Sequence, residues 1–389
     1  MKKTLAALAV MSAFAATSAF AADVTLYGIV DLGLKYSHVD TDEPGVDATD
    51  KFEMKSGGQS GSRFGLKGVE DLGNGMAVGF VLENGFNADD GTLGNNDRLF
   101  GREANLFIRG AFGELSFGRV GQLTSGNGSY GLTGNLSPFG TSWGGSVEGS
   151  TFMVGYSRMD NTVTYKTPTF AGFTAYAQYS FEMNTKGVGT DDKHYGTEGK
   201  SSADRYYALG ATYKNGGLNL VGVVDSYNWS TYQDARDDVD DGITFTLGGS
   251  YDFGPAKAYL GAQYYDNMYA AQDFDDDGDT FASIGTGISG QFEGYSVMTG
   301  VDAPVFGGKA MFALGYADTE AAETAAGEEK AESTRWGVSA GYTYPFSKRT
   351  NVYAVAAYYQ DKIENEEGKK GSDRDPSNSA LFLGLRHTF

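Results

Sequence analysis

Residues Leu381–Phe389 read LFLGLRHTF, and this stretch decides the fold. Alternate side chains of a strand point to opposite faces, so one face here carries mainly apolar groups and the other a mixture. The strand is followed by no polar tail, because the chain ends on an aromatic residue. A soluble protein rarely exposes the edge of such a strand, whereas a closed barrel pairs its last strand with its first. We therefore expect barrel closure and an assembly signal at four apolar positions: Leu381, Leu383, Leu385 and Phe389.

The N-terminus has the features of a secretory signal. Two lysines precede an apolar run from Leu5 to Phe14, and Ala19–Ala21 has the small-residue pattern of a cleavage site. The run is too short to cross a bilayer as a helix. We expect residues 1–21 to be removed, or one residue more with cleavage after Ala22, which leaves a single domain of residues 22–389. Together with the apolar last strand, this predicts location in the outer membrane, reached through the periplasm.

Composition and charge argue against several classes of protein. The chain has 30 Lys+Arg and 50 Asp+Glu, a net charge of −20 that falls to −22 without the signal, because that segment carries two lysines and no acids. Phosphate contacts need clustered Lys and Arg, so we expect no nucleic-acid partner. The absence of cysteine excludes a disulfide framework and a thiol nucleophile. Only three histidines occur, and no catalytic partner for them can be read from the sequence, so we expect neither an enzyme nor a cofactor.

Apolar and polar residues alternate along the whole chain. Segments 173–181, 243–253 and 335–344 each alternate over about the 9–11 residues that a tilted strand needs to cross a bilayer. A soluble sandwich would also alternate, over shorter strands. Aromatic residues near strand ends, such as Tyr342 and Tyr344, favour the interfacial girdles of a membrane barrel.

Short turns and long polar loops follow each other between these strands. Gly, Asn and Pro supply the backbone angles that tight turns require. Seven turns and eight loops need sixteen strands, and short periplasmic turns with long outer loops are typical of outer-membrane barrels. The sequence therefore predicts an all-β, closed, sixteen-stranded antiparallel transmembrane barrel. The turns fall at 72–75, 112–114, 168–172, 215–217, 253–256, 305–308 and 345–348, and the loops near 38–61, 87–98, 122–157, 183–203, 230–241, 269–292, 319–333 and 362–377.

Motifs spread over the mature length carry a family resemblance. They include VTLYGIVDLG at Val24–Gly33, SRFGLKG at Ser62–Gly68, RMDNTVTY at Arg158–Tyr165 and the closing GLRHTF at Gly384–Phe389. In the order and spacing of these motifs the chain resembles the trimeric general porins of Gram-negative bacteria, especially the β-proteobacterial group. The resemblance implies a homotrimer, a third loop folded into the lumen as a constriction, and passive diffusion of small hydrophilic solutes and ions.

The third loop, residues 122–157, has a composition that agrees with this arrangement. It is the longest loop, it is rich in Gly, and its one acid is Glu148, whereas the other long loops are crowded with acids. A loop that lies against a barrel wall needs compactness, apolar anchors and few charges that repel one another. The alternative is a disordered surface loop, because long loops are often disordered.

Polar residues of each strand point into a water-filled barrel. The family's constriction pairs wall arginines with the third loop, and the matching positions here are Arg63, Arg102 and Arg158. Parity, the alternation of inward and outward side chains along a strand, independently supports an inward direction for Arg63 and Arg158. It is ambiguous for Arg102, and it makes Arg119 a weaker candidate. The alternative is that these arginines lie on the surface or the rim. The other residues predicted to line the lumen or constriction are Asp31, Lys35, Lys67, Glu83, Glu148 and Asp160.

One acidic loop matches the first half of a calcium-binding EF-hand loop. Its D-x-D-x-D-G pattern ends at Gly278 and would place oxygen ligands around a hard cation. Position twelve is Ile284 instead of the bidentate Glu, and strands flank the loop, so a solvated acidic loop is favoured. The candidate ligands for Ca²⁺ or another divalent cation are Asp273, Asp275, Asp277 and Asp279.

We interpret the chain as a non-specific diffusion porin. A substrate-specific outer-membrane channel, the main alternative, would show an aromatic ladder along the lumen, whereas the inward positions read from parity are mostly Thr, Ser, Gly and charges. A structural or adhesive barrel would need a plug-sized segment, and none is found beyond the third loop. Expected partners are outer-membrane lipid, lipopolysaccharide, the barrel assembly machinery and further copies of the chain. We expect weak anion preference at high salt, because screening weakens the acidic mouth before it weakens a contact-range constriction.

Overall fold

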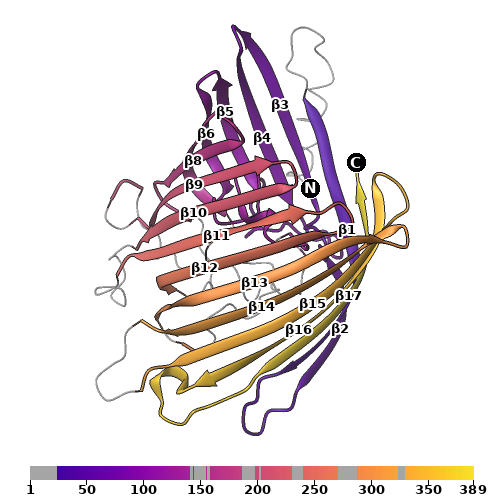
Figure 1. Cartoon of the computed structure of the whole chain (residues 1–389), viewed down its shortest axis with the longest axis vertical. Coiled ribbons are helices and arrows are strands. Elements are labelled where there is room, and N and C mark those ends of the chain that lie inside the picture. The colour runs from indigo at the N-terminus through magenta and orange to yellow at the C-terminus, as the bar shows by residue number, and fades with distance from the viewer. Residues whose placement is uncertain are drawn as a thin grey trace, which may run out of the picture.

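The computed structural model describes residues 24–140, 143, 155, 158–185, 198–200, 203–229, 240–269, 287–288, 290–322 and 329–389. Within these residues, seventeen strand segments form one antiparallel sheet that closes on itself (Figure 1). None of the helices among the described residues has the length and apolar character needed to cross a membrane. The predicted signal segment lies outside the described residues.

The strands follow one another around the barrel in chain order, and each is antiparallel to its neighbours. They are β1 (Thr25–Asp40), β2 (Thr49–Ser56), β3 (Arg63–Gly73), β4 (Met76–Gly85), β5 (Glu103–Gly110), β6 (Gly113–Gly121), β7 (Arg158–Lys166), β8 (Phe173–Ser180), β9 (Arg205–Asn215), β10 (Leu218–Asn228), β11 (Gly242–Asp252), β12 (Lys257–Tyr269), β13 (Gln291–Val305), β14 (Gly308–Ala321), β15 (Glu332–Pro345), β16 (Thr350–Glu364) and β17 (Ser377–Thr388). Two short 3₁₀ turns, η1 (Thr133–Asn135) and η3 (Glu366–Gly368), lie in loops.

Two of the segments, β2 and β3, share one position in the barrel. β3 pairs with the first part of β1 and with β4, while β2 pairs with the second part of β1. Residues 57–62 separate them, and Figure 1 shows the two segments running away from each other. The seventeen segments therefore make the sixteen strands that the sequence predicts, and the fold class is confirmed.

The tight turns lie where the sequence predicts them. In the β3–β4 turn, Gly73, Asn74 and Gly75 all have positive φ angles, of 79°, 53° and 75°. Glycine adopts such angles without steric cost and asparagine tolerates them, which explains the LGNG sequence of this turn.

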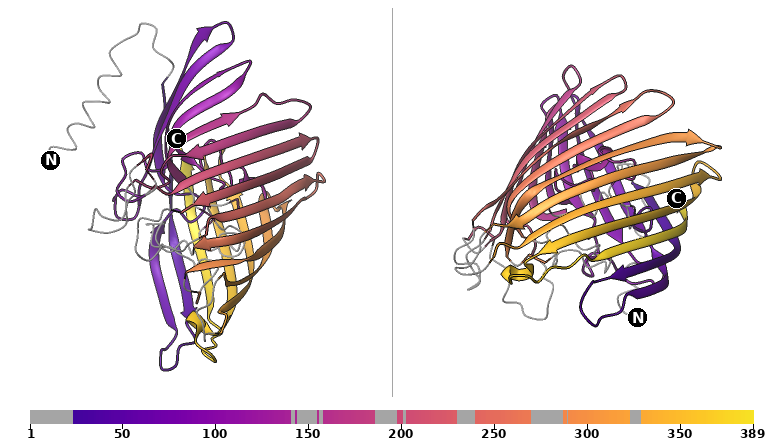
Figure 2. Two further views of the ribbon diagram at one scale, coloured as in Figure 1. Left: turned by 90° about the vertical axis from the view of Figure 1, so that its left-hand side faces the viewer. Right: turned by 60° about the horizontal axis from the view of Figure 1, so that its bottom comes forward.

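Alternation sorts the side chains between the two faces of the wall. On the outer face, Leu247 of β11 and Leu260 of β12 are 69% and 65% exposed. On the inner face, Thr246 of β11 and Gln263 of β12 are buried. Each lies an odd number of positions from the leucine of its own strand, so it points the other way. Large aromatic side chains lie at the short-turn end, where Phe170, Phe253, Phe306 and Phe346 are strongly exposed. An outward apolar band that ends in aromatic residues is typical of a barrel in a lipid bilayer. Figure 2 shows the tilt of the strands in this wall.

The last strand meets the first at the short-turn end. The backbone N–H groups of Gly28 and Phe389 each donate to the other's carbonyl oxygen at 3.0 Å. A side chain on Gly28 would begin 2.2 Å from the Phe389 ring, so only glycine leaves room for that ring. β17 continues along β1 from Thr388 opposite Ile29 to Ser377 opposite Asp40. The outer side of this seam carries the exposed side chains of Leu381, Leu383, Leu385 and Phe389.

Candidate pore constriction

The third loop leaves β6 after Gly121 and lies along the inner wall of the barrel. Its described part covers residues 122–140, 143 and 155. A side chain on Gly300 of β13 would begin 2.6 Å from Pro138, and one on Gly341 of β15 would begin 2.6 Å from the Phe139 ring. Glycine at these wall positions therefore leaves room for the Pro138 and Phe139 rings of the loop to lie directly against the wall. The loop thus follows the wall from β9 toward β16.

Apolar side chains fasten the loop to the wall at both ends of this path. Leu123, Leu132 and Leu136 are buried in one cluster with inward residues of β9–β13, such as Tyr206 and Val223. Further along, the Trp143 ring lies 5.6 Å from the Phe139 ring and 5.3 Å from the Tyr353 ring, in edge-to-face geometry. Such pairs contribute beyond the apolar area that they bury.

A buried carboxylate adds a polar anchor near the start of the loop. Asp225 of β10 is 1% exposed and accepts hydrogen bonds from Thr124 of the loop, from Thr244 of β11, and from Tyr206 of β9 at 2.8 Å. Gln122 donates to the Tyr227 hydroxyl at 3.0 Å. A buried carboxylate is stabilised only when donors satisfy its oxygens, so this contact holds the loop in one place.

A second polar contact joins the third loop to β6. The Tyr130 hydroxyl donates to Glu114 of β6 at 3.0 Å. Burial raises the pKa of the Tyr130 phenol above its ordinary value, so the hydroxyl stays protonated and remains a donor.

Two of the three predicted constriction arginines meet at one carboxylate. Glu83 of β4 accepts from Arg102 Nε at 2.8 Å and from the Tyr27 hydroxyl at 2.9 Å, and it lies 3.6 Å from Arg63. Arg102 and Glu83 are buried, whereas Arg63 is partly exposed. Arg102, whose orientation parity left open, therefore points to the same place as Arg63.

The third predicted arginine, Arg158, lies elsewhere on the wall. Its guanidinium donates to Asn127 of the third loop at 3.1 Å, and Glu103 of β5 is an electrostatic neighbour. The parity that predicts its direction does not continue across this strand, because β7 has one extra residue between Thr162 and Met159 and Asn161 has a φ of 49°. Such a bulge shifts the following side chains to the other face. Arg158 thus contacts the loop from the strand end.

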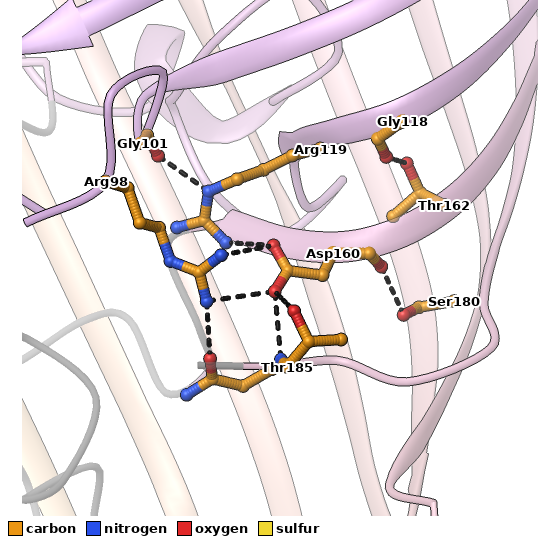
Figure 3. Close-up of polar contacts among 9 residues, drawn as sticks. Arg98, Gly101, Gly118, Arg119, Asp160, Thr162, Ser180 and Thr185 are labelled. Atoms are coloured by element: carbon orange, nitrogen blue, oxygen red, sulfur yellow. Dashed lines mark hydrogen bonds and ion pairs between the residues drawn. The ribbon is translucent and has the colours of Figure 1, made fainter. Parts of the chain in front are cut away.

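Asp160, another predicted constriction residue, belongs to a separate ion-pair network beside this bulge. Its carboxylate lies 2.6 Å from Arg119 and 3.0 Å from Arg98, and it accepts from the backbone N–H of Thr185 at 2.9 Å (Figure 3). Arg119 also donates to the carbonyl of Gly101 at 2.7 Å. The network joins β6 and β7 to the loops that precede β5 and follow β8. Asp160 is buried, and the guanidinium groups of Arg98 and Arg119 compensate its charge.

Three more predicted lumen residues lie on β1 and β3. Asp31 is fully buried and accepts from the Tyr353 hydroxyl at 2.6 Å. Lys35 is buried on the same face of β1. The Lys67 ammonium lies 5.0 Å from the centre of the Tyr27 ring. Tyr27 thus contacts both Lys67 and Glu83 on the inner wall.

The other predicted site residues lie outside the described residues. These are Glu148 of the third loop and the candidate cation ligands Asp273, Asp275, Asp277 and Asp279. In the part of the chain that the structure describes, no group of three or more His, Cys, Asp or Glu side chains is arranged to hold a metal ion.

The structure adds functional candidates that sequence reasoning missed. Glu103 is buried, accepts from Asn105 at 2.6 Å and lies against Gly128 of the third loop. Asp225 and Arg386 also point inward from their strands. In the sequence, each of these three is only a charged residue on a strand. Such a residue alone does not show which side chains lie opposite it in the barrel.

The inner wall also carries more aromatic residues than parity suggested. Tyr206, Tyr227 and Tyr265 are completely buried, and Phe292 and Phe382 are 1% and 2% exposed. Tyr206 and Tyr227 belong to the cluster that holds Leu123 and Leu132 of the third loop. The aromatic residues in this cluster therefore act as packing surfaces for the loop, and their faces are not open to water.

Comparisons with known proteins agree with this architecture. The sequence model of the Gram-negative porin family matches residues 4–364. An outer membrane porin protein of Bordetella pertussis is 35% identical, and outer membrane porin protein 32 of Delftia acidovorans is 30% identical, each over the whole of both chains. The structure of an anion-selective porin from Comamonas acidovorans superposes with a TM-score of 0.66 at 26% identity, covering 95% of this chain and all of that one. The chain belongs to the Gram-negative porins, the channel-forming barrels of the outer membrane.

Proposed function

We propose that this porin is a non-specific diffusion channel for small hydrophilic solutes and ions, and that it assembles as a homotrimer. One observation carries the proposal. The third loop lies against the inner wall from β9 to β16 and is anchored at Asp225, at Glu114 and by Trp143. A loop held inside the lumen narrows a water-filled barrel without closing it.

The proposed constriction lies between this loop and the wall that carries Arg63 and Arg102. These two cations share the single carboxylate of Glu83, so the group keeps a net positive charge. Arg158 adds a third cation, with Glu103 as its acidic neighbour, where it contacts the loop. The outer loops carry many acids, so the mouth attracts cations while the constriction favours anions. The relative from Comamonas acidovorans, described as anion-selective, supports this direction.

A substrate-specific channel is the second candidate, and the inward aromatic residues favour it at first sight. A solute that stacks along an aromatic path needs the exposed faces of the rings. Tyr206 and Tyr227 are instead covered by the third loop. The observed packing therefore supports general diffusion over stacking of a particular substrate.

Conductance in a planar bilayer tests the proposal. The purified protein should give three equal steps per insertion, as expected for three open barrels. In a salt gradient at high concentration the reversal potential should show weak anion preference, and the preference should shift toward cations as salt is lowered, since the Debye length grows from about 3 Å at 1 M to about 10 Å at 0.1 M. Arg102→Gln should reduce the anion preference. A strong cation preference at 1 M that Arg102→Gln leaves unchanged would refute the basic constriction.

The acidic outer loops suggest a further part of this function. We propose that they bind divalent cations that bridge the porin to anionic lipopolysaccharide. The D-x-D-x-D-G segment, with candidate ligands Asp273, Asp275, Asp277 and Asp279, is the strongest single candidate, since oxygen ligands at alternate positions suit a hard cation.

A further inference from the structure

The interruption of the second strand forms a short turn, residues 57–62, that is fastened to the inner wall. Asp31 Oδ2 accepts from the backbone N–H groups of Gln59 at 3.0 Å and Ser60 at 2.7 Å. The Gln59 side chain accepts from Asn351 of β16 at 2.7 Å. A small turn with this many partners keeps one conformation, so it can orient the side chains that rest on it.

Three arginines from different parts of the chain meet this turn. Arg63 Nε donates to the carbonyl of Gly61 at 2.8 Å, and Arg386 Nε donates to the Ser60 hydroxyl at 3.0 Å. Arg102 Nη1 lies 2.9 Å from the point where a side chain on Gly61 would begin. β3, the loop before β5, and β17 thus bring three guanidinium groups to two neighbouring residues of the turn, Ser60 and Gly61.

Arg386 differs from the other two in how its charge is balanced. Arg63 and Arg102 share Glu83. The acid opposite Arg386 in the register is Asp31, whose charge acts on Arg386 through space. The two Asp31 oxygens accept from Tyr353 and from the backbone of the 57–62 turn, so Arg386 does not contact them directly. Across the described residues Arg386 forms no ion pair within 4.0 Å, and its side chain is partly exposed on the inner face.

We propose that Arg386 is a further pore-lining arginine that determines ion selectivity. The 57–62 turn positions it as a transient binding site for small inorganic anions and carboxylates. The proposal deepens the basic constriction proposed above and rests on it. The Ser60 hydroxyl accepts from Nε, and the terminal nitrogens of Arg386 make no hydrogen bond to the described residues, which leaves them available to a passing anion. A planar guanidinium held in this way presents donors that match a carboxylate or another oxyanion.

Reversal potentials in a KCl gradient test the proposal with matched variants. Arg386→Gln removes one positive charge from the proposed anion-binding site, while Arg349→Gln removes one from the exposed β15–β16 turn. For an ion passing at about 6 Å in water-like surroundings, losing one positive charge should lower the chloride-to-potassium permeability ratio about three- to fourfold at 0.1 M and less than about 1.5-fold at 1 M. Arg349→Gln should change the ratio less at both concentrations.

Arg386→Lys separates charge from structure, because lysine keeps the charge and cannot reproduce the guanidinium geometry. Its permeability ratio should stay within about twofold of wild type. A fall as large as that of Arg386→Gln would show that the residue acts through structure, and it would overturn the proposal. An unchanged ratio in Arg386→Gln, while Arg102→Gln lowers the ratio, would overturn it as well and leave the basic constriction intact. An unchanged ratio in Arg102→Gln with a fall in Arg386→Gln would instead refute the constriction at Glu83.

Discussion

Asp225 should control how firmly the third loop is held in the lumen, and removing its carboxylate should release the start of the loop. Thr124 is the loop residue that donates to Asp225, and Thr244 and Tyr206 donate from the wall. Asp225→Ala deletes the shared acceptor of all three. The apolar contacts of Leu123, Leu132 and Leu136 remain, so the loop should open more often without leaving the barrel.

The size of the effect follows from the contact that the loop itself loses. A hydrogen bond to a charged group contributes about 1.5–3 kcal/mol. Losing the bond from Thr124 should therefore raise the opening equilibrium constant of the loop about 10- to 150-fold, since about 1.4 kcal/mol is a factor of ten. Asp225→Asn keeps one acceptor oxygen and should give an intermediate increase.

The natural absence of cysteine provides a direct assay. Leu136 is completely buried against the wall, so a thiol at Leu136→Cys reacts with a neutral reagent only when the loop opens. We expect the labelling rate of this reporter to rise about 10- to 150-fold in the Asp225→Ala background. Asp302→Ala serves as the control, because Asp302 contacts Tyr259 and Lys309 in the wall. Equal labelling rates with Asp225→Ala and without it would refute the anchoring role of Asp225.

Three further predictions concern closure, pH and cations. Deleting Phe389 removes the two backbone bonds to Gly28 and the ring seated over it, so the amount of heat-modifiable folded porin in the outer membrane should fall; unchanged amounts would contradict the assembly role of this residue. Burial raises the pKa of Glu182, in the loop after β8, from 4.5 to about 8, so the folded state holds this proton more tightly than the unfolded state does. The free energy of unfolding should therefore decrease as pH rises from about 4.5 to about 8. In thermal melts, Glu182→Gln should make that decrease smaller, and identical pH profiles for the two proteins would rule out a contribution from Glu182. EDTA should lower thermal stability if the 273–279 loop binds calcium, by about 2.7 kcal/mol at a hundredfold excess of calcium over the dissociation constant, and Asp275→Asn with Asp277→Asn should abolish the effect. An EDTA effect of the same size in that double variant would assign it to lipopolysaccharide instead.

The bulge beside Arg158 shows where alternation along a strand is not enough to place a side chain in a barrel. Parity is reliable only while each residue of a strand faces one residue of its neighbour. The extra residue near Asn161 breaks that count in β7, so the positions on the two sides of it do not share a face. Arg119 of β6, the weaker candidate from the sequence, lies opposite this bulge and pairs with Asp160. A bulge has no sufficient local signal, because it depends on the neighbouring strand.

The sequence by itself determined the barrel, its number of strands, its seam and its lipid-facing side. These follow from short-range rules: alternation with a period of two, turn residues with positive φ, and an apolar last strand such as Leu381–Phe389. Only the tertiary structure decided which charges meet in the lumen. Arg63, Arg102 and Arg386 converge on the 57–62 turn, and Asp225 receives Thr124, through contacts between residues that lie far apart in the chain. Such contacts depend on the register of the closed barrel and on the path of the third loop, and neither is encoded in the pattern of any one strand.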